Sequence, residues 1–253
     1  MKLVVLGSGT SVPHAQRTAA AFWLQTGASS ILLDVSCDAP HRLAQEGLDW
    51  ANLSAIWISH FHLDHLGGLA PFLFATKWAP QTQARRQPLT VYGPVGMKQL
   101  ITAIDESNHY GLFDQQFTVE ITEVPGAEEF EILPGLHAGT FSTPHNRESL
   151  AIRLEDRWSS LVYTSDTGCS DGLAEFAKAA TVLLIECSFR RHKPVQTHLE
   201  LADVINIARA SNPQKLVLTH LYPEWDNFNI EAEARALWPG ETIEAVDGLR
   251  IEF

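Results

Sequence analysis

Four potential metal ligands lie within six consecutive residues, His60-Phe61-His62-Leu63-Asp64-His65. They directly follow an apolar segment, 55–59, that is typical of a β-strand. In an extended loop, residues two apart point to the same side, so His60 and His62 can share one ion. Asp64 and His65 fall at the expected turn into a helix and can reach a second ion. The chain must therefore fold so that other strand ends bring further ligands to this loop.

Imidazole and carboxylate ligands without thiolate suit zinc first, with manganese or iron as alternatives. Four ligands do not complete the coordination of two ions. Three further candidates each follow an apolar segment: His145, Asp166 and His220. Any one of them alone could be a hydrogen-bonded structural histidine or a helix-capping aspartate. Together with the six-residue cluster, they indicate a site for two metal ions.

Apolar segments separated by turn residues predict two halves built on one plan, a β-meander followed by alternating strands and helices. The expected strands are 3–6, 22–26, 30–35, 55–59, 89–93, 117–124, 129–133, 137–142, 150–154, 160–164, 181–186 and 215–219. The expected helices are 39–46, 67–77, 95–107, 172–178 and 199–210. This plan fits an α/β (α+β) fold, a four-layer αββα sandwich of two mixed β-sheets with external helices. No long Ser/Gly-rich linker interrupts the chain, so we expect a single domain over residues 1–253.

The composition is that of a globular protein, with 45% hydrophobic and 19% charged residues among 253. Its formal net charge of −12 repels polyanions at long range, which disfavours a nucleic-acid partner. No apolar run approaches the roughly 18 residues of a membrane helix, so we expect a cytoplasmic protein with no membrane partner. The three cysteines, Cys37, Cys169 and Cys187, show no C-x-x-C spacing, and we expect them to be buried free thiols.

The order H-x-H-x-D-H, then a lone His, a lone Asp and a final His, resembles the five-part signature of the metallo-β-lactamase superfamily. The similarity spans nearly the whole chain. The closer match is to the RNase Z group and its small phosphodiesterase relatives. Three features carry it: the start at 6–13, the stretch 184–188, and His198 ahead of the segment 218–223.

The resemblance implies a role for each candidate residue. One metal would take His60, His62 and His145, and the other Asp64, His65 and His220, with Asp166 bridging the two. Asp34, after the strand at 30–35, would orient the metal-binding loop; its alternative is a plain turn residue. A hydroxide shared by the two ions would attack the substrate. Asp64 would also orient the attacking water, and His198, braced by Glu186, would protonate the leaving alkoxide.

Departures from the RNase Z pattern bear on the substrate. Ile185 stands where that family has a histidine, and His198-Leu199-Glu200 replaces its His-Ser-Thr. Only 20 residues separate His145 from Asp166, which leaves room for one hairpin but not for the arm that grips precursor tRNA. We therefore expect a phosphodiesterase acting on a small anionic ester such as a cyclic nucleotide. The alternatives are hydrolysis of a lactone, β-lactam, thioester or sulfate ester, tRNA 3′ processing, or a non-catalytic metal-binding role.

Several segments outside the ligand set have open roles. Gly7-Ser8-Gly9-Thr10 follows a strand without completing a dinucleotide-binding motif, so we expect a tight turn near the site. Substrate contacts from His14, Arg17 and the loops 77–86 and 108–113 are open, and so is a homodimer, which the resemblance implies.

Overall fold

Two seven-stranded mixed β-sheets form the centre of the computed structural model, which describes residues 1–253. The first sheet contains β1 (Lys2–Gly7), β2 (Ala21–Thr26), β3 (Ser29–Leu33), β4 (Ala55–Trp57), β5 (Leu89–Pro94), β6 (Val119–Val124) and β14 (Arg250–Glu252). The second contains β7 (Glu129–Leu133), β8 (Leu136–Ser142), β9 (Leu150–Glu155), β10 (Ser160–Tyr163), β11 (Val182–Glu186), β12 (Lys215–Thr219) and β13 (Glu241–Glu244).

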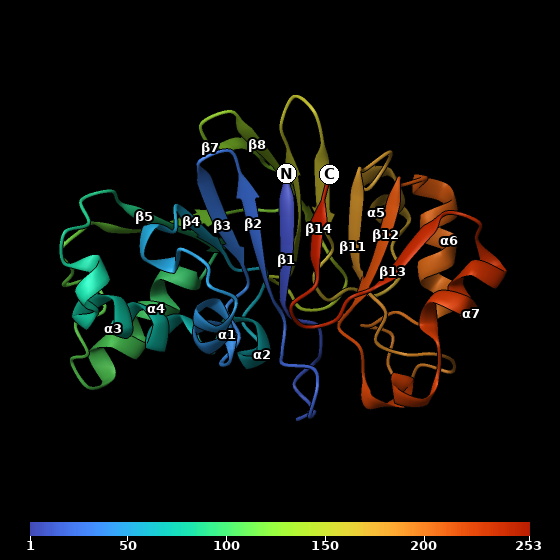
Figure 1. The fold of residues 1–253 in the computed structure, drawn as a ribbon, viewed down its shortest axis with the longest axis horizontal. Helices are drawn as coiled ribbons and strands as arrows, with labels where there is room; N and C mark the ends of the chain where they lie inside the picture. The colour runs from blue at the N-terminus through green and yellow to red at the C-terminus, as the bar shows by residue number, and fades with distance from the viewer.

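Helices cover the outer faces of both sheets (Figure 1). The helices beside the first sheet are α1 (Ala39–Gln45), α2 (Leu63–Leu66), α3 (Leu69–Trp78) and α4 (Met97–Ser107). Those beside the second are α5 (Asp171–Phe176), α6 (Leu201–Ser211) and α7 (Ile230–Leu237). Short 3₁₀ helices are η1 (Trp50–Asn52), η2 (Pro80–Thr82) and η3 (Pro223–Asn227). The arrangement confirms the four-layer αββα sandwich expected from the sequence.

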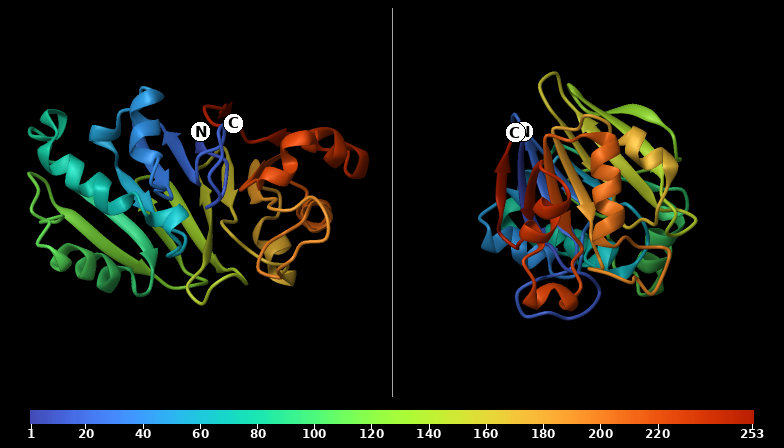
Figure 2. Two further views of the ribbon diagram at one scale, coloured as in Figure 1. Left: turned by 90° about the horizontal axis from the view of Figure 1, so that it is seen from below. Right: turned by 90° about the vertical axis from the view of Figure 1, so that its right-hand side faces the viewer.

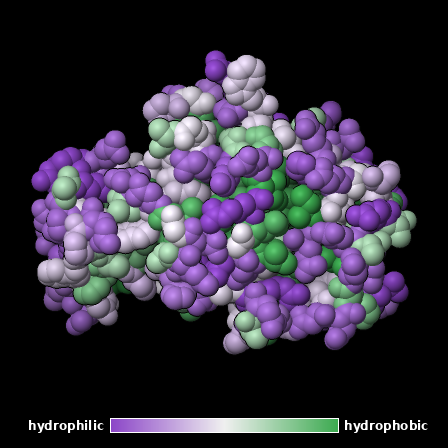
Figure 3. Space-filling model, viewed as in Figure 1, coloured by the Kyte–Doolittle hydropathy of each residue, from purple (hydrophilic) through white to green (hydrophobic).

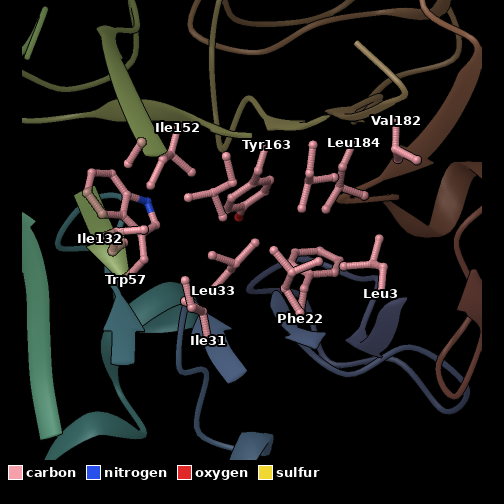
Figure 4. Close-up of a cluster of buried hydrophobic side chains, with 14 of the residues drawn as sticks. Leu3, Phe22, Ile31, Leu33, Trp57, Ile132, Ile152, Tyr163, Val182 and Leu184 are labelled. Atoms are coloured by element: carbon pink, nitrogen blue, oxygen red, sulfur yellow. The ribbon is translucent and has the colours of Figure 1, made fainter. Parts of the chain in front are cut away.

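Three hydrophobic clusters correspond to the three interfaces of the sandwich. Strand residues alternate between them: Ile31 and Leu33 join the cluster between the sheets, whereas Leu32 joins the cluster beneath α1 and α3. Figure 4 shows side chains of both sheets meeting in the central cluster, with Phe22 beside Tyr163. A third cluster joins the second sheet to α5, α6 and α7. Burial on both faces explains why the central strands read as continuous apolar runs.

Parallel strand pairing brings the functional segments to one end of the molecule. The first sheet is parallel from β3 to β6 and the second from β10 to β13, so each set has its carboxyl ends at one edge. A hydrogen bond from Tyr163 Oη to Asp34 joins the ends of β10 and β3. In Figure 1 this end lies at the bottom, and the left panel of Figure 2 shows it from below.

All twelve strands expected from the sequence are present, and the antiparallel pairing of β1, β2 and β3 is confirmed. Three details differ from the expectation. Asp64 and His65 lie in the short helix α2 rather than at a turn. His198 precedes α6, which begins at Leu201 behind a capping box at Glu200. Three C-terminal elements, α7, β13 and β14, were not predicted.

The cysteines differ from the expectation that all three are buried, and Arg85 in the loop 77–86, whose role was open, has a structural role. Only Cys187 is buried, whereas Cys37 and Cys169 are exposed. Arg85, in the loop 77–86, is buried and donates to the carbonyls of Ala51 and Leu53, so it holds loops together rather than facing a substrate.

Hydrophilic residues cover most of the face in Figure 3, with a hydrophobic area near its centre. Among the helices, none has the length and apolar character needed to cross a membrane.

Candidate metal centre

Every proposed ligand stands on a loop or helix at the carboxyl end of a strand. His60 and His62 follow β4, and Asp64 and His65 lie in α2 directly behind them. His145, Asp166 and His220 follow β8, β10 and β12. The structure therefore brings together all seven residues that the sequence singled out.

The seven residues form two groups whose ligand atoms lie within 4.8 Å of one another. The first group contains His60, His62, His145 and Asp166, and the second contains Asp64, His65 and His220. This division is the one implied by the family resemblance.

Asp166 turns one carboxylate oxygen to each group. Its Oδ2 lies 3.6 Å from His145 Nε2 and 3.8 Å from His60 Nε2. Its Oδ1 lies 3.3 Å from His65 Nε2 and 3.4 Å from His220 Nε2. The carboxylate thus stands between the two groups, in the position that a shared ligand would take.

Four buried polar atoms at the centre have no hydrogen-bond partner: His60 Nε2, His65 Nε2, His220 Nε2 and Asp166 Oδ1. A buried polar atom without a partner costs about 1–3 kcal/mol, so such atoms rarely cluster without a ligand. Nitrogen and oxygen donors grouped in this way fit divalent zinc, manganese or iron. The residues present therefore fit the metal that the signature implies.

The electrostatics of the site favour added positive charge. Burial by itself raises the pKa of Asp166, but the surrounding imidazoles, His220 and His65 first, hold it well below its usual range. Burial likewise opposes charge on His65, yet Asp166 and Asp34 outweigh it and raise the pKa of His65. At His60, burial and the neighbouring His65 lower the pKa. Carboxylates that stay ionised here attract cations.

The backbone of the site is held in an uncommon conformation. Asp34, Ser165 and His220 have φ of 57°, 53° and 56°. A residue with a side chain at positive φ costs about 1–3 kcal/mol, and such positions cluster at functional sites. Asp34 and His220 directly follow β3 and β12, and Ser165 lies two residues after β10. At each position the chain turns toward the centre.

Asp34 lies behind the first metal-binding loop, where the sequence placed it. Its Oδ2 lies 2.7 Å from His65 Nδ1, and its Oδ1 accepts from the Ser59 backbone N–H at 2.8 Å. A carboxylate accepts hydrogen bonds, so His65 Nδ1 carries a proton, which leaves Nε2 as the nitrogen that could bind a metal.

Glu186 holds His198 as expected. Its Oε1 lies 2.9 Å from His198 Nδ1 and also accepts from the Thr167 backbone N–H at 2.7 Å. Its Oε2 accepts from Ser188 Oγ at 2.6 Å, and Ser188 Oγ lies 2.9 Å from His220 Nδ1. Burial opposes charge on His198, but the hydrogen bond to Glu186 outweighs it and raises the pKa.

Ser188 is a functional contact that the sequence reasoning missed. Because its hydroxyl proton goes to Glu186, its oxygen accepts from His220 Nδ1–H, which leaves His220 Nε2 free for the centre. His198 stacks on His220, with ring centroids 5.4 Å apart. Its nearest nitrogen also lies within 4.8 Å of ligand atoms of Asp166 and His220.

A cavity of about 420 Å³ opens beside Asp64. The loop between β1 and β2 forms much of its wall, including Thr10, His14 and Arg17. Both basic side chains are already paired, because His14 Nε2 lies 3.0 Å and Arg17 Nη1 2.6 Å from the Asp226 carboxylate. The loop 108–113 is absent from this lining.

The tight turn expected at Gly7-Ser8-Gly9-Thr10 is not present, because Gly7 ends β1 and Gly9 forms a β-bridge to Ala19. A Cβ at Gly7 would lie 1.8 Å from the Ala19 carbonyl oxygen, so the two ends of the loop meet only with glycine there. Asp247 fixes the same loop by accepting four hydrogen bonds from the backbone N–H and hydroxyl groups of Ser8 and Thr18.

Comparisons with known proteins agree with this geometry. The probable metallo-hydrolase YhfI of Bacillus subtilis is 25% identical over 250 residues, covering 98% of both chains. Its crystal structure superposes with a TM-score of 0.84 and covers 100% of this chain and 99% of its own.

Two further similar proteins are named as enzymes. The ribonuclease Z of Pyrobaculum aerophilum is 26% identical and covers 88% of each chain. A diphosphatase of the PhnP family has a TM-score of 0.77 at 23% identity and covers 100% of this chain and 97% of its own.

Residues 1–238 match the family model described as the anti-Pycsar protein Apyc1. The match includes the whole ligand set, from His60 to His220. The chain therefore belongs to the Apyc1 family, within the RNase Z-like group of metallo-β-lactamase-fold hydrolases.

Proposed function

We propose that this protein is a two-metal hydrolase that cleaves a small phosphodiester, such as a cyclic nucleotide. The observation that carries the proposal is the Asp166 carboxylate, whose two oxygens face different ligand groups at 3.3–3.8 Å. A carboxylate shared in this way is what a two-metal site needs to hold its ions close together.

In this proposal the first ion is held by His60, His62 and His145, the second by Asp64, His65 and His220, and both by Asp166. Zinc is the first choice for these donors, and manganese or iron the alternative. When bound, two such ions make a water nucleophilic at neutral pH and neutralise charge on the substrate oxygens. The chain's own residues place the substrate and move its protons.

His198 is the proposed general acid. Glu186 accepts its Nδ1–H at 2.9 Å, which fixes the ring and points the other nitrogen toward the centre. From there it can give a proton to the leaving oxygen. Its side chain is 12% exposed, so a substrate can reach it.

Asp64 is the proposed group that orients the attacking water. Its Oδ2 lies 3.7 Å from His220 Nε2 and 3.8 Å from His65 Nε2, and the residue also lines the cavity. It therefore stands at the boundary between the second ligand group and the space available to a substrate. A carboxylate there can accept a hydrogen bond from water on the cavity side.

The size and charge of the cavity support a small, singly charged substrate. About 420 Å³ accommodates a nucleotide-sized group. Asp226 already pairs with His14 and Arg17, so these side chains offer little charge to a second phosphate. The names of the ribonuclease and diphosphatase relatives favour phosphorus–oxygen bonds over a lactone or β-lactam.

The RNase Z relatives make tRNA 3′ processing the second candidate. Against it, the chain between His145 and Asp166 forms only the β9–β10 hairpin, which is where the tRNA-gripping arm would be inserted. The net charge of −12 also opposes a polyanion of that size.

A substrate panel on the metal-replete protein tests the proposal. It would compare a cyclic nucleotide, bis(p-nitrophenyl) phosphate, a lactone, a β-lactam, a sulfate ester and a precursor tRNA. We expect the highest kcat/KM for a phosphodiester. If the lactone, β-lactam or sulfate ester is turned over at least about a hundredfold faster than the phosphodiester, the proposed scissile bond is wrong. Efficient cleavage of the precursor tRNA would contradict the proposed small substrate.

A further inference from the structure

Tyr163 in the second sheet and Ser165 in the loop after it contact two buried residues of the first half of the chain, Asp34 and Ser59. Tyr163 ends β10, and Ser165 follows it by two residues at positive φ. Tyr163 Oη donates to Asp34 Oδ2 at 2.6 Å, and Ser165 Oγ donates to Ser59 Oγ at 2.7 Å. All four residues are buried. The contacts therefore cross the interface between the sheets at the metal centre.

The direction of each hydrogen bond follows from the number of protons available. Ser59 Oγ lies 2.8 Å from Asp34 Oδ2 and must donate to it, because a carboxylate only accepts. Having given its one proton, Ser59 Oγ can only accept from its other neighbours, Ser165 Oγ and, at 3.0 Å, His60 Nδ1. His60 Nδ1 must therefore carry a proton.

The same reasoning applied to His65 gives the same tautomer. His65 Nδ1 donates to Asp34 Oδ2, the oxygen that Tyr163 and Ser59 also approach. In both histidines Nδ1 thus carries a proton, which leaves Nε2 as the nitrogen available to a metal, and in each this atom is buried without a partner at the centre. One carboxylate controls a ligand of each of the two groups.

We infer that Tyr163 and Ser165 are positioning residues for the metal centre, holding His60 and His65 in their metal-binding tautomer through Ser59 and Asp34. The inference rests on the proposed metal site but not on the proposed substrate. Tyr163 keeps the carboxylate of Asp34 in place from the opposite sheet. Ser165 donates to one lone pair of Ser59 Oγ, whose proton goes to Asp34, so the site that remains toward His60 is a lone pair that accepts from Nδ1–H.

Two variants remove the hydroxyls with little change in packing. Tyr163→Phe deletes one oxygen. Ser165→Gly deletes the other while relieving the strain of a positive φ, so its backbone should be at least as stable as that of the wild type. Tyr92→Phe is the matched control, because Tyr92 also packs in the interface between the sheets and donates at 3.3 Å to the Ile132 carbonyl, outside the ligand set.

Competition titration of the metal-free proteins with Zn²⁺ and a chelating dye measures the effect. Outer hydrogen bonds to metal ligands are typically worth 10- to 100-fold in affinity. We expect a loss of about that size for Tyr163→Phe and Ser165→Gly, and none for Tyr92→Phe. Long-range ¹H–¹⁵N spectra of the histidines give a second measurement: the wild type should show Nδ1–H at His60, and Ser165→Gly a mixture of the two tautomers there.

Wild-type affinity in both variants, or an Nε2–H tautomer at His60 in the wild-type protein, would overturn the inference. Its failure is separate from that of the proposed function. A wild-type protein that binds Zn²⁺ and loses affinity in the variants, but cleaves no phosphodiester, would support the positioning roles and refute the substrate. A wild-type protein that binds none of Zn²⁺, Mn²⁺ and Fe²⁺ would refute both.

Discussion

Two buried carboxylates, Asp34 in the first half of the chain and Glu186 in the second, stand behind the metal centre in the same way. Each accepts four hydrogen bonds. Each receives the proton of a serine, Ser59 or Ser188, whose oxygen then accepts from a histidine Nδ1.

The difference lies in the histidines that the two networks hold. Behind Asp34, both His60 and His65 are fully buried, and each has an unpartnered Nε2 at the centre. Behind Glu186, only His220 has such an atom, while His198 is partly exposed. The same hydrogen-bonding arrangement would thus serve two tasks: behind Asp34 it holds two buried candidate ligands, and behind Glu186 it holds His220 together with a partly exposed histidine.

The largest expected effect comes from the residue where the two networks meet. Asp166→Asn removes the negative charge that both ligand groups face. We expect kcat/KM to fall by more than about 10³-fold, the upper range for one electrostatic contact at a catalytic centre. Steady-state kinetics with bis(p-nitrophenyl) phosphate measures it, with exposed Asp171→Asn as the control. A wild-type rate for Asp166→Asn would refute its shared role.

His198→Ala tests whether the partly exposed His198 has a different role from the buried candidate ligands. A general acid is typically worth 10²–10⁴-fold, so we expect about 10²-fold slower cleavage of diesters with alkoxide leaving groups and a much smaller effect with p-nitrophenolate. Metal content should stay at the wild-type level. Equal slowing of both substrates, or loss of a metal ion, would instead make His198 a ligand.

A matched pair of carboxylate variants compares the two networks directly. Asp34→Asn keeps a residue that tolerates positive φ but removes the acceptor for His65 and Ser59. We expect Zn²⁺ affinity to fall about 10- to 100-fold. Glu186→Gln should lower turnover at saturating metal more than it lowers affinity. Dye competition measures the Zn²⁺ affinity and steady-state kinetics the turnover of the same samples. Equal changes of affinity and turnover in the two variants would show that the two networks have the same role.

The smallest effects should come from the serines. Ser59→Ala and Ser188→Ala each remove one hydroxyl behind one ligand, His60 or His220, and leave the carboxylates intact. We expect a loss of Zn²⁺ affinity of no more than about tenfold in each. The same titration measures it. A loss larger than that of Asp34→Asn would mean that the serines, not the carboxylates, fix the ligands.

Much of the fold and the ligand set could be predicted from the sequence because the signals are local. The cluster from His60 to His65 is contiguous, and Asp166 and His220 each follow a buried strand, where parallel pairing brings them together. The Asp34 and Glu186 positions were likewise readable, because each stands at the carboxyl end of an apolar run.

The rest depends on contacts between distant segments. Ser188 lies in the matched stretch 184–188 and Ser165 directly precedes Asp166, but no sequence pattern gives the partner of either hydroxyl. Their contacts appear only in the folded structure. The strand β14 has three residues, too few for a periodic signal, and is defined by pairing with β1. Asp247 lies 239 residues from Ser8 in sequence, so no local signal could join it to the loop.

The central claim is that two ligand groups share Asp166 and hold two ions. Elemental analysis of protein purified without chelator tests it most directly, with Asp166→Asn purified in parallel. The account predicts close to two transition-metal ions per wild-type chain and a clear loss in the variant. One ion or none in the wild type would contradict it.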